Sequence, residues 1–245
     1  MKLSVCIPMY NESAIAALSA AMYSRALDLM FGDDYELIFC DDGSLDGSAE
    51  LVRAAGLPRV RVIGYEHNRG KGSAVRHAVM AAEGDIILYT DCDCAYGTDK
   101  IGEAVRIFDE RPDDDVVIGS RNLDGSGYEG YTLLRRIMSK TYILVIKLAA
   151  GFRHSDSQCG FKAWRRDAAK AVFERCETDG FAFDIEALMI AEKLGFRVTE
   201  MPVRIINHSE ASSKVHPVRD TLRMLRDLHR IKRRVKKLPV PEKNK

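Results

Sequence analysis

The stretch Asp85-Ile-Ile-Leu-Tyr-Thr-Asp-Cys-Asp93 joins a short apolar run to a pair of acidic residues, and it is the clearest guide to the fold. Asp85–Thr90 has the length and the branched and aromatic content of a buried strand. Four other apolar runs have the same character: Leu3–Pro8, Tyr35–Cys40, Val60–Tyr65 and Val116–Ser120. We therefore expect five short buried strands in the first half of the chain.

Helical patterns lie between these runs, at Ser13–Phe31, Ser48–Ala55, Ser73–Ala82 and Lys100–Asp109. This alternation predicts an α/β fold, with a mostly parallel sheet covered by helices on both faces. Ligands of such sheets bind beyond the carboxyl ends of the strands. Polar clusters stand at three of those ends: Asn11-Glu-Ser13, Asp41-Asp-Gly-Ser44 and Asp91-Cys-Asp93.

The regular alternation of strands and helices ends after residue 120. The predicted elements there are a loop at Leu123–Thr132, a helix at Leu133–Ala150, a turn and strand at Asp156–Arg166, a helix at Ala182–Lys193 and a strand at Val198–Ile206. Residues 217–237 show the spacing of a basic amphipathic helix. We interpret the chain as one domain, residues 1–213, followed by a tail, residues 214–245.

The net charge of +1 over 245 residues conceals an asymmetry. The tail holds 12 basic and 3 acidic residues, a charge of +9, which leaves 25 basic and 33 acidic residues, a charge of −8, for residues 1–213. Such a tail favours an anionic partner, a membrane surface or nucleic acid. No aromatic residues are interleaved with the charges, so we expect the anionic membrane and no nucleic acid.

Composition and targeting signals exclude several classes of protein. With 46% hydrophobic and 30% charged residues, the chain is neither disordered nor collagenous. We find no signal peptide and no apolar run long enough to span a bilayer. The six cysteines are scattered, so we expect reduced thiols and a cytoplasmic protein.

Asp91 and Asp93 form the sharpest candidate site. Two carboxylates at the end of a buried strand can hold a hard divalent cation, Mg²⁺ or Mn²⁺, whose other positions remain for water and substrate phosphates. The alternative is a solvated loop. The cluster at residues 41–48 is either a capping turn or a contact for a base or ribose. The cations Arg121, Arg135, Arg136 and Lys214 lie on charged helix faces or clamp phosphates.

Taken together, these pieces resemble the family 2 glycosyltransferases of the GT-A fold. The similar segments are Val5-Cys-Ile-Pro-Met-Tyr-Asn-Glu-Ser13, Asp41-Asp-Gly-Ser-Leu-Asp-Gly-Ser48, Asn68-Arg-Gly-Lys-Gly-Ser-Ala74, Asp91-Cys-Asp93 and Gly119-Ser-Arg121. Further segments resemble the polyprenyl-phosphate hexosyltransferases, and most of all the dolichyl-phosphate β-glucosyltransferases: Asp156-Ser-Gln-Cys-Gly-Phe-Lys162, Phe181-Ala-Phe-Asp-Ile-Glu186, Glu200-Met-Pro-Val203 and Ser213-Lys-Val215.

The resemblance implies roles for the matching residues. The base and ribose of a nucleotide sugar would contact Pro8, Tyr10, Glu12, Cys40 and Asp42, and the nucleotide sugar would also contact Lys71 and Cys92. The metal and the diphosphate would be held by Asp91 and Asp93. The donor diphosphate or the acceptor phosphate would be bound by Arg121, Arg135, Ser139 and Lys214.

The expected reaction is inverting transfer of a hexose, glucose from UDP-glucose, onto a polyprenyl phosphate at the inner face of the cytoplasmic membrane. The alternative is transfer of mannose from GDP-mannose. Mannosyl relatives often carry a Gln two residues after the second Asp, whereas this chain has Ala95, which makes the mannosyl assignment weaker. A family 2 enzyme with a hydroxyl acceptor would need Asp156 or Asp184 as a base. A non-catalytic nucleotide-sugar-binding module is the alternative from another class. The oligomeric state stays open.

Overall fold

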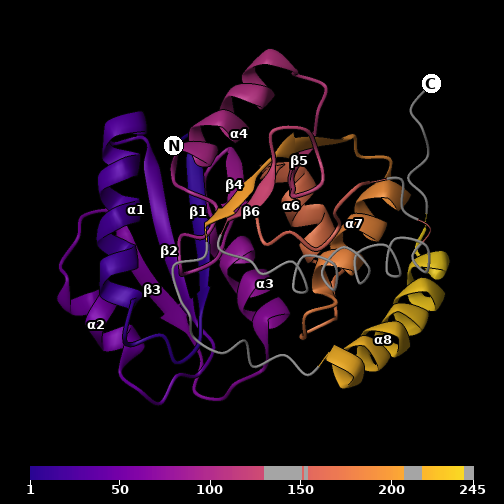
Figure 1. Cartoon of the computed structure of the whole chain (residues 1–245), viewed down its shortest axis with the longest axis horizontal. Helices are drawn as coiled ribbons and strands as arrows, with labels where there is room; N and C mark the ends of the chain where they lie inside the picture. Colours follow the sequence, from indigo (N-terminus) through magenta and orange to yellow (C-terminus); the bar gives the residue numbers. More distant parts are fainter. Residues whose placement is uncertain (130–150, 152–153, 207–216, 240–245) are drawn as a thin grey trace.

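The computed structural model describes residues 1–129, 151, 154–206 and 217–239, and it is a sheet between two layers of helices (Figure 1). Seven strands form the sheet in the order β3-β2-β1-β4-β7-β5-β8. The strands are β1 (Leu3–Met9), β2 (Tyr35–Asp41), β3 (Val60–Gly64), β4 (Ile86–Tyr89), β5 (Val116–Ser120), β6 (Gly127–Glu129), β7 (Lys162–Arg165), β8 (Val198–Pro202) and β9 (Arg204–Ile206). The helices are α1 (Ala16–Phe31), α2 (Ser48–Ala54), α3 (Lys71–Ala81), α4 (Asp99–Glu110), α6 (Arg166–Phe173), α7 (Phe183–Leu194) and α8 (Pro217–Lys237).

The first four strands form the parallel part of the sheet, as their near-continuous apolar sequences predict. β1 pairs with β2 from Leu3↔Tyr35 to Met9↔Asp41, and on its other side with β4. β3 continues the parallel order beside β2. The carboxyl ends of β1, β2 and β4 consequently meet at one edge of the sheet, which confirms the mostly parallel α/β fold.

β7 breaks the parallel order. It runs antiparallel between β4 and β5, with Tyr89 opposite Lys162 and Val116 opposite Trp164. β8 then adds to the outer side of β5 in the parallel sense. The insertion of β7 brings the Lys162 side chain, which is fully buried, into the middle of the sheet.

Two apolar clusters hold the helices to the sheet. One cluster lies beneath α1, α2 and α4, and the other lies beneath α3, α6, α7 and α8. In Figure 1, α1 and α2 lie at one end of the sheet and α7 and α8 at the other. Each cluster consists almost wholly of aliphatic, aromatic and small residues, so burial of apolar area stabilises both layers.

The helix predicted at 217–237 is present as α8, and its apolar side is part of the core. Met224, Leu228, Ile231 and Val235 are each 3–6% exposed and pack with residues of α7 and its neighbours. The opposite side carries basic residues that the solvent reaches. The apolar side of the described tail therefore packs on the domain. The division at residues 213 and 214 stays a prediction.

Several boundaries differ from the expectation. α1 begins at Ala16 and not at Ser13, because residues 13–15 form a turn in which the carbonyl oxygen of Glu12 accepts from the N–H groups of Ile15 and Ala16. The N–H groups of Glu12 and Ser13 donate to the side chains of Ser48 and Asp46.

The second half holds two elements that the sequence analysis missed: helix α6, and the short strand β6 inside the predicted loop. The last predicted strand is two strands, and the second, β9, pairs with β6 in a separate sheet. The helix expected at Leu133–Ala150 lies outside the described residues. Within the part of the chain that is described, no helix is both long and apolar enough to cross a membrane.

Candidate active site

Asp91 and Asp93 follow β4 at the carboxyl edge of the sheet. The Asp91 side chain is 27% exposed and Asp93 is exposed, whereas Cys92 and Cys94 between and after them are buried in the core. The Tyr23 hydroxyl donates to the carbonyl oxygen of Asp91 at 2.9 Å. Cys92 and Asp93 form a turn after β4, and Cys94 has a left-handed backbone conformation with φ 55°, so the chain leaves the sheet with its cysteines inward and its acids outward. The two cysteines anchor the segment and the two acids are accessible.

Lys71, the first residue of α3, forms an ion pair with the Oδ1 atom of Asp91. Burial lowers the pKa of Lys71, but the charges of Asp91 and Asp184 outweigh it, and the net pKa is raised. The ammonium group is therefore charged at neutral pH. The structure brings these two residues together across 20 positions of sequence.

Gly160 lets the chain before β7 pass directly beside Asp91. A Cβ atom at residue 160 would stand 2.5 Å from the Oδ2 atom of Asp91. Any side chain there would displace the carboxylate. Gly160 lies in the segment Asp156–Lys162 that carries the resemblance, and this was its only signal in the sequence, where no role of its own was assigned to it.

The chemistry of Asp91 and Asp93 fits a hard divalent cation. Burial, followed by the like charge of Asp91, raises the pKa of Asp93, so a nearby cation would be stabilising. Carboxylate oxygens are the ligands that Mg²⁺ and Mn²⁺ prefer. Within the described ranges no group of three or more His, Cys, Asp or Glu side chains could hold a metal. Among the described residues, Asp91 and Asp93 would hold the ion, and its other positions remain for further ligands such as water and substrate.

Asp42 holds the loop that leads into α3. Its buried carboxylate accepts hydrogen bonds from the Tyr65 hydroxyl at 2.6 Å, the Asn68 amide at 2.8 Å and the backbone N–H groups of Arg69 and Gly70. These donors surround both carboxylate oxygens. Asp42 thus fixes the approach of residues 65–70 to the site.

The ends of β1 and β2 are joined by side-chain hydrogen bonds. The N–H group of Asn11 donates to the Ser44 hydroxyl at 2.9 Å, and the N–H group of Leu45 donates to the Asn11 side chain at 2.9 Å. Tyr10 is 42% exposed. Of the other expected base and ribose contacts, Pro8 and Glu12 are half-buried and Cys40 is fully buried. Burial, with the charges of Asp42 and Asp41, raises the pKa of Cys40 to about 12, so its thiol stays protonated.

Arg121, after β5, forms a two-pronged ion pair with Asp156. Its Nε atom lies 2.6 Å from Oδ2 and its Nη2 atom 2.9 Å from Oδ1 of that fully buried carboxylate. Burial acts to raise the pKa of Asp156, but the charge and hydrogen bonds of Arg121 outweigh it and lower the pKa. The Arg121 guanidinium is therefore already engaged with a carboxylate.

A second buried ion pair joins β7 to α7. The Lys162 Nζ atom, which is fully buried, donates to Asp184 Oδ1 at 2.6 Å and to the carbonyl oxygen of Cys159 at 2.5 Å. The Tyr89 hydroxyl at the end of β4 donates to the same Asp184 oxygen at 2.7 Å. These hydrogen bonds join β4, β7 and α7 to one another.

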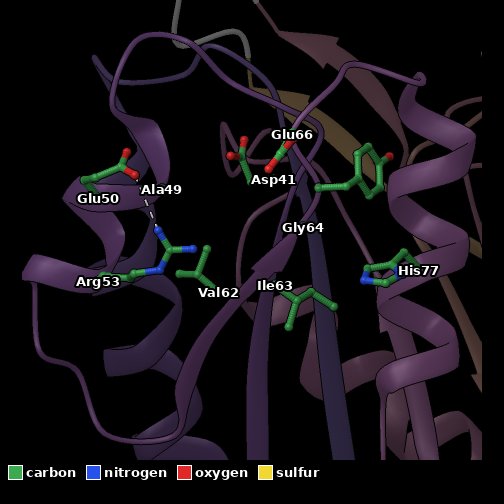
Figure 2. A pocket seen from close by; sticks show the side chains of 10 residues that line it. Asp41, Ala49, Glu50, Arg53, Val62, Ile63, Gly64, Glu66 and His77 are labelled. Atoms are coloured by element: carbon green, nitrogen blue, oxygen red, sulfur yellow. Dashed lines mark ion pairs between the residues drawn. The ribbon is translucent and has the colours of Figure 1, made fainter.

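Three expected phosphate-binding residues, Arg135, Ser139 and Lys214, lie outside the described residues. A hollow of about 500 Å³ has Asp41 and His77 among its lining residues. Figure 2 shows these lining side chains between α2 and α3. The exposed ion pair of Arg53 and Glu50, whose nearest atoms are 3.5 Å apart, lies on its α2 side. Asp91 and Asp93 do not line this hollow, which adjoins the loop held by Asp42 through Tyr65.

Comparison with known proteins identifies similar sequences along most of the chain. The family described as "Glycosyl transferase family 2" matches residues 4–173. A dolichyl-phosphate beta-glucosyltransferase from Drosophila melanogaster is 32% identical over 94% of this chain and 74% of its own length. The enzyme of that name from Dictyostelium discoideum is 30% identical over 94% of this chain and 73% of its own length.

Solved structures match the fold at lower identity. Glucosyl-3-phosphoglycerate synthase from Mycobacterium tuberculosis, crystallised with Mn²⁺, UDP and phosphoglyceric acid, superposes with a TM-score of 0.69 at 19% identity over 98% of this chain and 80% of that one. Mannosyl-3-phosphoglycerate synthase from Rubrobacter xylanophilus gives a TM-score of 0.65 at 18% identity over 98% and 76%. At such identity the likeness concerns the fold alone, and it agrees with the layers described above.

Proposed function

The chain belongs to glycosyl transferase family 2 and is a glycosyltransferase, and from this we propose that it transfers glucose from UDP-glucose to a polyprenyl phosphate. The names of the similar enzymes support both the sugar and the class of acceptor. In the proposed reaction an oxygen of the acceptor phosphate attacks the anomeric carbon. The bond from that carbon to the diphosphate breaks, UDP leaves, and the configuration inverts.

One observation carries the choice of a phosphate acceptor: Asp156 and Asp184, the two acids predicted as a base for a hydroxyl acceptor, are both engaged in ion pairs. Asp156 pairs with Arg121, which lowers its pKa, and Asp184 accepts from Lys162 and Tyr89. A hydroxyl acceptor must lose a proton during transfer and needs such a base. A phosphate monoester is already an anion at neutral pH, so it needs none.

The main difficulty of the proposed reaction is charge, because an anionic acceptor must approach an anionic diphosphate. Lys71, charged and at the carboxyl edge of the sheet, supplies one cation for the donor. Asp91 and Asp93 would hold Mg²⁺ or Mn²⁺, which when bound offsets the diphosphate charge and stabilises the UDP that leaves. Buried Cys92 and Cys94 keep the backbone of this segment fixed, so both carboxylates are pre-oriented.

A product analysis tests the proposal. The protein is incubated with Mn²⁺, undecaprenyl phosphate and either radiolabelled UDP-glucose or radiolabelled GDP-mannose, and the lipid is extracted. Label in the lipid from UDP-glucose is the expected result, with Asp93→Asn as the inactive control. If only GDP-mannose labelled the lipid, the transferred sugar would be mannose and not glucose. If neither donor labelled the lipid, the polyprenyl-phosphate acceptor would be refuted.

The exposed side of α8 supports peripheral contact with the anionic inner face of the membrane. Its described exposed basic residues are Arg226, Arg230, Lys232, Arg233, Lys236 and Lys237. Each basic residue near an anionic surface contributes about 1 kcal/mol. Because the apolar side of α8 is packed on α7, the proposed contact is electrostatic and involves no insertion of this helix.

Vesicle co-sedimentation of the full chain tests this contact. Deleting α8 would uncover the core on α7, so charge reversal is the better variant. Arg226→Glu with Arg230→Glu should weaken binding to anionic vesicles and leave the fold intact. Arg106→Glu with Arg111→Glu, an equal reversal on exposed residues of α4 and its end, is the matched control. Equal binding by the two double variants would refute docking through α8.

A further inference from the structure

Helix α8 is connected to the candidate active site by a series of polar contacts that begins at Arg234. The Arg234 side chain is 25% exposed and lies between two acids. Its Nη1 atom is 2.7 Å from an Oε atom of Glu177, and its Nη2 atom forms an ion pair with Glu186, which is fully buried. A buried carboxylate requires a partner, because an isolated charge in the interior is strongly destabilising. Arg234 supplies that partner from a helix 48 residues farther along the chain.

The second oxygen of Glu186 holds the loop formed by residues 177–180. It accepts hydrogen bonds from the backbone N–H of Glu177 at 3.0 Å and from that of Thr178 at 2.7 Å. One carboxylate thus binds the arginine with one oxygen and the start of the loop with the other. The position of the loop depends on the position of Glu186.

The same loop lies directly on the first turn of α3. The carbonyl oxygen of Asp179 accepts hydrogen bonds from the backbone N–H groups of Gly72 at 2.7 Å and Ser73 at 3.3 Å. Arg76, one turn farther along α3, forms an ion pair of 2.6 Å with the Asp179 side chain. A Cβ atom at Gly72 would collide with the carbonyl oxygen of Thr178. The glycine therefore permits a contact that a side chain would prevent.

Lys71 lies within that first turn, between Gly70 and Gly72, and pairs with Asp91. We propose that Arg234 and Glu186 are positioning residues for the donor site. They fix the 177–180 loop, the loop fixes the first turn of α3, and that turn presents Lys71 to Asp91 and to the donor diphosphate. This inference rests on the proposed function for the identity of the donor, while the positioning itself concerns only this chain.

Hydrogen exchange of the whole chain, with and without Arg234→Ala, tests the positioning directly. The expected result is that the amides of Gly72 and Ser73 exchange about tenfold faster in the variant than in the wild type. A factor of this size is typical of the coupling between two sites. The dissociation constant for UDP with Mn²⁺ should rise by a similar factor. Both are measured at 25 °C, below the melting temperature of the variant. A role confined to docking α8 would change exchange in α7 and α8 alone, and that result would overturn the proposal.

Two further variants keep the test decisive. Arg234→Lys keeps a positive charge beside Glu186, and hence the fold, but a single ammonium group cannot engage both acids as the guanidinium does. It should give an intermediate change at Gly72 and Ser73, and no change would overturn the proposal. Arg197→Ala removes an exposed arginine that pairs with Asp113 at 3.3 Å and should change neither measurement.

The failure of this inference can be told apart from the failure of the proposed function. A wild-type protein that neither binds UDP with Mn²⁺ nor transfers glucose would refute the proposed function, and the exchange measurement would still report the positioning. A wild-type protein that does both, with an Arg234→Ala variant equal to it in exchange and in UDP binding, would refute the positioning alone.

Discussion

Two groups of acidic residues have opposite environments. Asp91 and Asp93 follow β4, whereas Asp156 lies before β7 and Asp184 lies in α7. The Asp93 side chain reaches the solvent, yet its carboxylate is partly desolvated, and this desolvation together with the charge of Asp91 raises its pKa. Asp156 is fully buried and its pKa is lowered by Arg121, and Asp184 is paired with buried Lys162. The first region therefore has an excess of negative charge that a metal can offset. The second has its charges neutralised within the protein.

The difference shows that the role of a carboxylate in this fold depends on the charged groups that lie beside it. Asp93 has Asp91 as a like-charged neighbour and is prepared to bind a cation, whereas Asp156 and Asp184 are held by the interior cations Arg121 and Lys162 and fix the backbone. Asp91 also has a lysine partner, but Lys71 is partly exposed at the edge of the sheet, where one ammonium group faces two carboxylates. We therefore assign substrate chemistry to the end of β4 and structural roles to Asp156 and Asp184. Substitution of each acid tests the division.

Replacement of Asp93 should have the largest effect. Asp93→Ala removes one of the carboxylates proposed to hold the metal, and transfer should fall by about three orders of magnitude or more, about 4 kcal/mol in the barrier. Because Asp93 is exposed, the melting temperature should change little. Initial rates of lipid labelling and a thermal melt measure the two effects. A folded variant with near-normal turnover would refute the metal site.

Asp184→Asn should lower stability more than activity. The substitution leaves the fully buried Lys162 without its counter-charge, at a cost of about 3 kcal/mol. For a chain of this length that lowers the melting temperature by roughly 6–12 °C. At temperatures where the variant is folded, turnover should stay within about tenfold of the wild type. Complete loss of turnover in a folded variant would identify Asp184 as a base and favour a hydroxyl acceptor.

The sequence predicted the first region well because its signals are local. An apolar run of strand length followed by two acids places Asp91 and Asp93 at the end of β4, and the run alone indicates the strand. The start of α3 was predicted less well. The helix begins at Lys71, two residues before the predicted start, because the carbonyl oxygen of Asp179 from a distant loop accepts hydrogen bonds from its first turn.

The second region was harder to predict because its contacts are distant in sequence. No periodicity shows that β7 inserts antiparallel between β4 and β5, or that Lys162 meets Asp184 and Arg234 meets Glu186. α6 had a local signal that was missed, since Ala168, Ala169 and Val172 follow Asp167 at helical spacing. The amphipathic pattern of α8 was recognised, but the pattern alone could not decide whether its apolar side meets lipid or α7.

Asp156→Asn should give a smaller, pH-dependent loss of stability. The pKa of Asp156 is lower in the folded protein than in the unfolded chain, so the ionised carboxylate stabilises the fold above about pH 4. The stabilisation disappears as the pH falls through the lowered pKa. We expect the variant to be about 2 kcal/mol less stable at pH 7, with the difference shrinking below about pH 4. Urea unfolding at a series of pH values measures it, and a pH-independent difference would contradict the ion pair.

Asp93→Asn should have the smallest effect on stability. Unlike the substitutions of Asp184 and Asp156, it should stabilise the metal-free protein. The amide removes the repulsion from Asp91, so in buffer with EDTA the variant should be more stable than the wild type, by well under about 1 kcal/mol after solvent screening. Added Mn²⁺ should reverse the order, because a ligand that binds only the folded state raises its melting temperature by mass action. Thermal melts of both proteins across an Mn²⁺ titration measure the crossing. If the two proteins responded equally to Mn²⁺, the contrast between the two regions would fail, because Asp93 would then be one more structural acid.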